Sequence, residues 1–173
     1  MKQHLICLDL DGTLLNDAKE ITPYTFKVLK TLQAKGHAIM ISTGRPFRAS
    51  QRYYHELEMD TPIVNFNGAY VHHPKDPQFP MQHARLDEGI ASSIIETLKE
   101  MEVQNIIAFG DEDNDIEMIK YAKHGVAMEN AIPELKYIAK ETTASNNEDG
   151  IGLYLNDFFQ LNLSYKDIKE DSK

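Results

Sequence analysis

The sequence has a single cysteine, Cys7, so no disulfide can form within the chain. Basic residues are also scarce, because 18 lysines and arginines stand against 27 aspartates and glutamates, for a net charge of −9. Such a surface repels nucleic acids and anionic lipids, and we expect neither as a partner. No stretch reaches the roughly 18 consecutive apolar residues that a membrane-spanning helix requires, so no membrane span is predicted.

The amino-terminal apolar run is interrupted by Asp9 and Asp11 and lacks a cleavage site of small residues, so no signal peptide is predicted. Cys7 lies inside this run and is expected to be a small core residue, which fits a reducing, cytoplasmic location. A length of 173 residues, 42% of them hydrophobic, predicts one globular domain.

Hydrophobic patterning predicts an α/β fold. Residues 5–8 form an almost uninterrupted apolar run that ends at an Asp/Gly/Thr cluster, as strands buried on both faces do. Pro23 opens a helix predicted over about 23–35, which ends near a glycine. A second apolar run at 38–41 and a helical stretch at 46–57 complete a βαβα unit.

The later elements are predicted from the same signals, in which short apolar runs indicate strands and stripes at spacings of three and four indicate helices. They are a hairpin of 62–66 with 69–72, an exposed connector at 73–83, a helix at 87–102, a strand at 106–109, a helix at 116–122, a strand at 126–128, a helix at 133–140, a strand at 142–144, and a polar, frayed end at 161–173. This alternation is typical of a mainly parallel sheet covered by helices.

Two acidic clusters follow predicted buried strands. Asp9 and Asp11 come after the first strand, and Asp111 and Asp115 belong to a Gly-Asp-Glu-Asp-Asn-Asp stretch after the strand at 106–109. Because the carboxyl ends of parallel strands share one edge of a sheet, we expect these carboxylates to converge there. Carboxylates brought together repel one another unless a divalent cation neutralises them, and oxygen ligands alone favour Mg²⁺.

The second predicted strand is followed by Ser42, Thr43, Gly44 and Arg45. These residues offer hydroxyls, backbone N–H groups at a helix start and a guanidinium, which together suit a phosphate group. Each cluster alone is more often structural, because strand-end aspartates cap helices and Ser-Thr-Gly forms ordinary turns. A D-x-D-G-T match arises by chance in roughly one in a thousand chains of this length, so its coexistence with G-D-x-x-N-D argues against coincidence.

Together these motifs resemble the haloacid dehalogenase (HAD) superfamily, and within it the Cof-type (IIB) phosphatases. The matching segments are DLDGT at 9–13, ISTGR at 41–45, NGA at 67–69, GDEDND at 110–115, GVAMENA at 125–131 and NNEDGIG at 146–152. The resemblance covers about residues 1–72 and 105–158. It implies a Rossmann-like three-layer core and a Mg²⁺-dependent hydrolase of small phosphorylated metabolites.

The resemblance also implies roles for particular residues. Asp9 would be the nucleophile that takes the phosphoryl group, and Asp11 the acid that protonates the leaving oxygen and then activates water. Asp9, the backbone carbonyl of Asp11, and Asp111 would hold Mg²⁺, in a metal group completed by Asp115, which would also orient its neighbours. The residues expected to contact substrate are Thr43, Gly44 and Asn114, with Arg45 and Asn67 as second-line candidates.

The chain departs from the family between NGA and GDEDND. Cof-type enzymes carry an α/β cap domain there, whereas here only residues 70–109 separate the two motifs. We therefore expect one core domain over residues 1–158, with 73–104 as a vestigial cap or linker, a deletion seam near 103–108 and a polar tail at 159–173. The helix at 87–102 would be a cap remnant, and its apolar stripe suggests self-association.

The family's catalytic lysine also has no counterpart, because its expected neighbourhood contains Arg85, Asp87 and Glu88 instead. Lys99 and Lys120 are expected to be solvated surface lysines. Losing one preorganised electrostatic donor costs about 10²- to 10³-fold in rate, so weak catalysis is expected. The alternatives are a catalytically impaired remnant that binds Mg²⁺ and phosphate, and a receiver-like signalling module, against which the DGT and GDEDND motifs argue.

Overall fold

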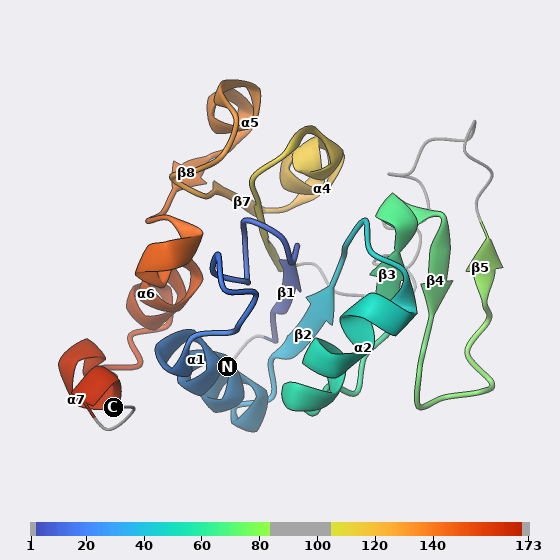
Figure 1. Cartoon of the computed structure of the whole chain (residues 1–173), viewed down its shortest axis with the longest axis horizontal. Coiled ribbons are helices and arrows are strands. Elements are labelled where there is room, and N and C mark those ends of the chain that lie inside the picture. Colours follow the sequence, from blue (N-terminus) through green and yellow to red (C-terminus); the bar gives the residue numbers. More distant parts are fainter. Residues whose placement is uncertain (1–2, 84–104, 171–173) are drawn as a thin grey trace.

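The main sheet consists of five parallel strands in the order β2-β1-β6-β7-β8, in a computed structural model that describes residues 3–83 and 105–170. The strands are β1 (Leu5–Leu8), β2 (Ala38–Ile41), β6 (Ile106–Gly110), β7 (His124–Ala127) and β8 (Glu141–Thr142). The α/β fold with a mainly parallel sheet is thereby confirmed. The first strand lies between β2 and β6, so it has a hydrogen-bonded neighbour on each side (Figure 1).

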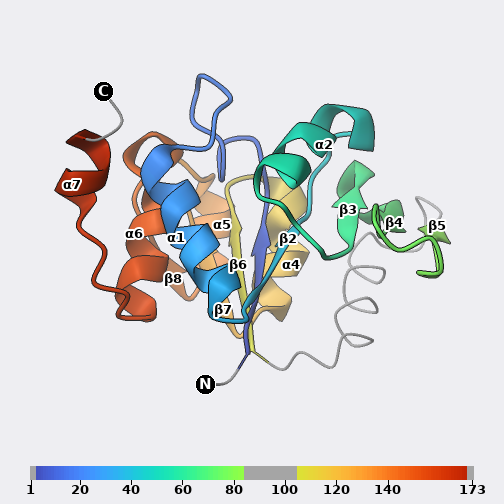
Figure 2. The ribbon, with the colours of Figure 1, turned by 90° about the horizontal axis from the view of Figure 1, so that it is seen from below.

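Helices cover both faces of this sheet. The α-helices are α1 (Pro23–Ala34), α2 (Phe47–Glu56), α4 (Ile116–Tyr121), α5 (Pro133–Ile138), α6 (Gly150–Phe158) and α7 (Tyr165–Glu170), and the 3₁₀ helices are η1 (Phe66–Gly68), η2 (Asp113–Asp115) and η3 (Asn146–Glu148). Helices α1 and α6 pack together on one face, and α4 lies against β6 and β7 on the other (Figures 1 and 2). This is the predicted three-layer arrangement.

A second, antiparallel sheet lies beyond the β2 edge, beside α2 (Figure 1). It consists of β3 (Ile63–Asn65), β4 (Tyr70–His72) and β5 (Gln82–His83). An isolated parallel bridge between Ser42 and Val64 joins it to the end of β2. The predicted hairpin is confirmed, and the segment 73–83, predicted to be an exposed connector, is largely exposed, although its last two residues pair with β4.

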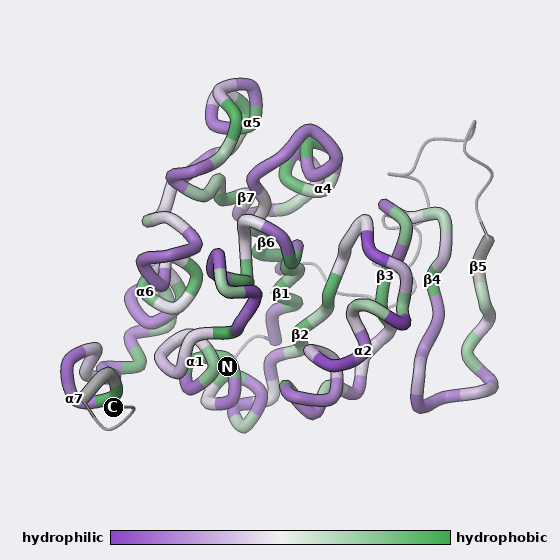
Figure 3. Tube along the Cα trace, viewed as in Figure 1, coloured by the Kyte–Doolittle hydropathy of each residue, from purple (hydrophilic) through white to green (hydrophobic). Residues whose placement is uncertain are grey.

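The core is built on the central strands. All four residues of β1 are buried, including Cys7 as predicted, and so are all five of β6. Three tyrosines, Tyr24, Tyr53 and Tyr54, are the largest fully buried side chains of the described residues. Hydrophobic residues gather along β1, β2 and β6, whereas the β4–β5 connection is largely hydrophilic (Figure 3).

The carboxyl-terminal part differs most from expectation. Residues 161–173 were expected to fray, yet α7 forms there and the ring of Tyr165 lies edge-on to that of Tyr24 at 4.8 Å. Helix α6 was not anticipated. The expected helix at 87–102 falls outside the described residues, as do residues 103–104 of the expected seam near 103–108. Within residues 3–83 and 105–170, no helix is long and apolar enough to cross a membrane.

Candidate active site

Two carboxylates follow the carboxyl end of β1. Asp9 is 6% exposed, and its backbone N–H donates a hydrogen bond to the carbonyl of Phe109, which ties the end of β1 to β6. Asp11 lies two residues further on, where the chain turns through Gly12 at a φ of +74°. Its side chain is 43% exposed. The same motif therefore presents one buried and one accessible carboxylate.

The carboxyl end of β6 supplies two more carboxylates. One carboxylate oxygen of Asp115 accepts the backbone N–H groups of Asp111 and Glu112, at 2.9 and 3.2 Å. Thr13 donates its hydroxyl to Asp111 at 2.7 Å, so the loops after β1 and β6 are bonded together. A Cβ atom at Gly12 would lie 2.1 Å from the Asp111 carboxylate, so this approach requires glycine.

Asp9, Asp111 and Asp115 form an acidic cluster, in which one carboxylate oxygen from each lies within 4.8 Å of the others. All three side chains are buried. Burial, followed by repulsion from Asp115 and other neighbouring carboxylates, raises the pKa of Asp9 well above its usual range. Burial raises the pKa of Asp115 to about 7 and also raises that of Asp111. Three buried oxygen donors that lack a countercharge fit a hard divalent cation.

Asp11 has the opposite electrostatic environment. Arg45 donates two hydrogen bonds of 2.6 Å to its carboxylate, one to each oxygen, and the ammonium of Lys19 lies 2.8 Å from one of them. The Arg45 hydrogen bonds, helped by Lys19, lower the pKa of Asp11 to about 2. The same contact raises the pKa of the Arg45 guanidinium further. Asp11 is therefore an anion held between two cations.

The segment after β2 packs against the turn after β3. The backbone N–H of Thr43 donates to Val64, and that of Asn67 donates to Thr43 at 3.1 Å. Asn67 adopts a left-handed φ of 54°, and its buried Oδ1 has no hydrogen-bond partner among the described residues. A Cβ atom at Gly44 would lie 2.8 Å from that oxygen, so the absence of a side chain at Gly44 permits the approach.

A cavity of about 260 Å³ joins these segments. It is lined by Asp9, Asp11, Thr43, Gly44, Arg45, Asn67, Glu112 and Asn114. All seven predicted substrate-binding and catalytic residues thus meet at one cavity, and the remaining two predicted residues, Asp111 and Asp115, lie beside Asp9. Sequence reasoning missed Glu112, although it lies within GDEDND, and Lys19, for which the sequence carries no local signal.

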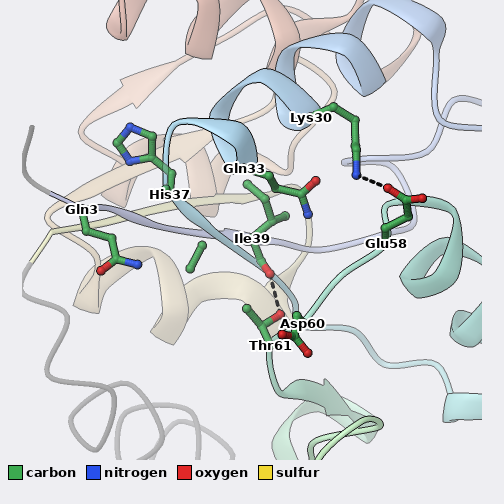
Figure 4. A pocket seen from close by; sticks show the side chains of 10 residues that line it. Gln3, Lys30, Gln33, His37, Ile39, Glu58, Asp60 and Thr61 are labelled. Carbon is green, nitrogen blue, oxygen red and sulfur yellow. Dashed lines mark hydrogen bonds and ion pairs between the residues drawn. The ribbon is translucent and has the colours of Figure 1, made fainter.

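A second cavity, of about 340 Å³, lies at the amino end of β2 (Figure 4), whereas the acidic cluster follows the carboxyl ends of β1 and β6. Lys30 on its wall is paired with Glu58 at 2.7 Å, and the Thr61 hydroxyl donates to Ile39 at 2.6 Å (Figure 4). Its ammonium and hydroxyl donors are therefore already engaged within the chain. The strand-end cavity remains the candidate active site, at the edge where α/β sheets bind ligands.

The sequence model of the haloacid dehalogenase-like hydrolases matches residues 6–106 and 99–155. The chain belongs to this family. One relative, the 5-amino-6-(5-phospho-D-ribitylamino)uracil phosphatase YitU of Bacillus subtilis, is 30% identical over 267 aligned positions, covering 92% of this chain and 99% of the relative. The pyridoxal phosphate phosphatase YbhA of Escherichia coli is 38% identical over 72 residues, which cover 42% of this chain and 26% of that relative.

Solved structures of this hydrolase family share the fold. A haloacid dehalogenase-like hydrolase from Bacteroides thetaiotaomicron superposes with a TM-score of 0.79 at 22% identity, covering 91% of this chain and all of that one. The predicted Cof-type membership is confirmed, and with it the enzyme class, a phosphoric monoester hydrolase. The HAD-like core is confirmed as well.

Proposed function

We propose that this hydrolase cleaves small phosphate monoesters through a phospho-aspartate on Asp9, with Mg²⁺ as its cofactor. The observation that carries the proposal is the convergence of the acidic cluster with a cavity that also presents Arg45 and the backbone of Thr43 and Gly44. Carboxylates for a cation, a buried nucleophile and phosphate-binding groups are the components that phosphoryl transfer requires.

The residues take complementary parts in this scheme. A carboxylate oxygen of Asp9 attacks phosphorus, the bond to the leaving oxygen breaks, and Asp11 gives that oxygen its proton. Water then attacks the phospho-aspartate while Asp11 takes a proton from it, which releases inorganic phosphate and restores Asp9. Because Asp11 has a pKa of about 2 between Arg45 and Lys19, those ion pairs must loosen before it can carry a proton at neutral pH.

Thr43, Gly44 and Asn114 are the proposed contacts to the non-bridging phosphate oxygens, with Arg45 and Asn67 at the rim. All five line the same cavity as Asp9. The unpartnered oxygen of Asn67 is an acceptor for a hydroxyl of the substrate or a water molecule. These assignments predict tight binding of the phosphate and little selection of the rest of the molecule.

The cofactor would be held by Asp9, the backbone carbonyl of Asp11, Asp111 and Asp115. The raised pKa values of Asp9, Asp111 and Asp115 support this assignment, because their charges lack compensation within the described part of the chain. When bound, a magnesium ion neutralises the carboxylates and draws charge from the phosphoryl oxygens. Asp115 contributes a second effect, since its hydrogen bonds fix the backbone at Asp111.

We infer that the cap is reduced and that catalysis is correspondingly impaired. The alignment with YitU spans 267 positions, more than the 173 residues present here, and the family match is split into two segments that meet at 99–106. Both facts agree with a break in the region of the expected seam. The proposed division is a core at 1–158, a cap remnant at 73–104 and a tail at 159–173.

The substrates proposed are small phosphorylated metabolites. The relatives named above act, by their names, on phosphorylated small molecules, and the cavity of about 260 Å³ accommodates a phosphate group rather than a large ligand. Self-association through the helix expected at 87–102 also remains a proposal, because those residues lie outside the described ranges.

The deciding assay is Mg²⁺-dependent hydrolysis of 4-nitrophenyl phosphate by the wild type, Asp9→Asn and Asp157→Asn. Asp157 is exposed on α6 and provides a matched carboxylate control. Loss of the nucleophile is expected to lower turnover by about 10³-fold or more, and EDTA should abolish the remaining wild-type rate. The control should match the wild type. Equal rates for wild type and Asp9→Asn would exclude the proposal.

The same assay separates a working enzyme from an impaired remnant. If the cap and the family lysine matter as expected, kcat/KM should be about 10²- to 10³-fold below that of YitU on the same substrate. A comparable value would refute impairment. No Asp9-dependent turnover, together with retained binding of Mg²⁺ and phosphate, would identify the chain as a binding remnant.

A further inference from the structure

The cavity beside the acidic cluster has a shortage of positive charge. Among the described residues that line it, Arg45 is the one cation, whereas Asp9, Asp11 and Glu112 are carboxylates. A phosphate monoester brings up to two further negative charges into this space. A single guanidinium and one divalent cation leave the site negative overall, so a second protein cation near the rim has a clear electrostatic purpose.

Lys19 meets that need by position. Its ammonium nitrogen lies 2.8 Å from an oxygen of Asp11, the same oxygen that accepts a hydrogen bond from Arg45. Asp11 lines the cavity, so the ammonium lies one hydrogen bond away from its lining, although Lys19 is not itself a lining residue. The Lys19 side chain is 51% exposed, so its flexible four-carbon stem is free to move toward the cavity.

The fold fixes the backbone from which this side chain extends. Lys19 has a left-handed φ of 62°, uncommon for a residue with a side chain. Its carbonyl accepts hydrogen bonds from Arg52 at 2.8 Å and from the Tyr53 hydroxyl at 2.9 Å, both on α2. Its N–H donates to Asn16, whose side chain accepts the N–H of Glu20. The backbone position of Lys19 is therefore fixed in part by Arg52 and Tyr53, which are distant in sequence.

The other side of this loop is held as well. Asn146 donates its side-chain amide to the carbonyl of Leu15 at 2.9 Å, and Asn147 accepts the backbone N–H of Asp17 at 3.0 Å. Helix α2 and the η3 segment thus hold the loop from two directions. These contacts fix the backbone of the loop, and with it the point from which the Lys19 side chain reaches Asp11.

We propose that Lys19 is a phosphate-binding residue of this site, which transfers its ammonium from Asp11 to the phosphoryl group of the bound ester. Asp11 holds the two cations, Lys19 and Arg45, close to the cavity where the phosphate is proposed to bind. A phosphate dianion competes for both, and its binding releases the carboxylate of Asp11 for proton exchange. This proposal rests on the proposed function, and it names the cation that recognises the phosphate.

The test compares Lys19→Met and Lys19→Arg with the control Lys120→Met. Lys120 is a matched lysine because its side chain is 53% exposed and also forms a carboxylate pair, with Glu117 at 3.1 Å. Lys19→Met is expected to raise the inhibition constant of inorganic phosphate and the KM for 4-nitrophenyl phosphate by about tenfold. Lys19→Arg should recover part of this loss, and Lys120→Met should show none.

The outcomes distinguish this proposal from the proposed function. If the wild type lacks Asp9-dependent turnover, the proposed phosphatase function fails. The affinity of the same variants for inorganic phosphate in the presence of Mg²⁺ is then measured by calorimetry. A tenfold weaker affinity in Lys19→Met would still support the role of Lys19. Unchanged phosphate affinity or inhibition in Lys19→Met, or the absence of phosphate binding by the wild type, would overturn it. A fall in kcat alone would assign Lys19 a positioning role and would also overturn it.

Discussion

Replacing Asp115 with asparagine should make the metal-free protein respond differently to pH. The side chain is 2% exposed, and its pKa is raised from 3.8 to about 7, mainly by burial. Asparagine keeps the shape and can still accept the N–H groups of Asp111 and Glu112. It removes the negative charge and the hydrogen bond from Asn114 at 3.2 Å, and only the loss of charge depends on pH.

The magnitude follows from linkage. Between about pH 4 and 7 the folded wild type keeps a proton on Asp115 that the unfolded chain has released, so the free energy of unfolding falls as pH rises. The slope is at most about 1.4 kcal/mol per pH unit and falls to half of that at the folded pKa, so the loss between pH 5 and pH 7 is about 2 kcal/mol. Asp115→Asn does not incur this loss. Its stability relative to wild type should therefore improve by about 2 kcal/mol over that interval.

Urea unfolding in EDTA at pH 5 and pH 7 measures this difference, with Asp157→Asn as the exposed control. Adding Mg²⁺ at pH 7 should raise the wild-type midpoint, because the ion supplies the missing countercharge. The rise should be smaller for Asp115→Asn. A stability difference between Asp115→Asn and wild type that stays constant from pH 5 to pH 7 would refute the electrostatic account of the acidic cluster.

Two further predictions concern a glycine and the cysteine. Gly12→Ala should lower the turnover of 4-nitrophenyl phosphate about 10²-fold, because the added Cβ would lie 2.1 Å from the Asp111 carboxylate. Gly36 has a φ of 87° and nothing within 4 Å of an added Cβ, so Gly36→Ala should keep its turnover and cost only about 1–2 kcal/mol of stability. Equal turnover in the two variants would contradict this. Burial raises the pKa of the Cys7 thiol to about 12, so a disulfide reagent at pH 8 should modify Cys7 only as fast as the protein unfolds. Rapid modification of the native protein would show that β1 opens locally.

The sequence was sufficient for the elements that carry the site. The apolar run at Leu5–Leu8, and a similar one at Ile106–Gly110, is bounded by turn residues and is typical of strands buried on both faces. Such strands pair in parallel, and their carboxyl ends meet, so Asp9 and Asp111 could be placed together from local signals alone. The structure adds that the β1 loop is bonded to the β6 loop through Thr13.

What the sequence could not supply depends on distant contacts. Helix α6 contains Gly150 and Gly152, which locally favour a turn, but a Cβ atom at Gly152 would lie 2.8 Å from Tyr24, so the glycine permits close packing on α1. Lys19 looks like an ordinary loop lysine until Arg52 and Tyr53 fix its carbonyl. Neither relationship leaves a periodic or compositional trace.

The place of residues 84–104 in the chain bears on how the segment between β5 and β6 can vary in length. They join β5 to the amino end of β6, whereas Asp111 and the cavity lie at the carboxyl end of that strand. The register of β6 against β1, which begins with Leu5 opposite Ile106, is set by the paired strands themselves. Segments of very different length can therefore be gained, lost or exchanged at this junction without moving Asp111 or the other proposed metal ligands. A substrate-recognition domain could be inserted at this junction while the core keeps the geometry of the site.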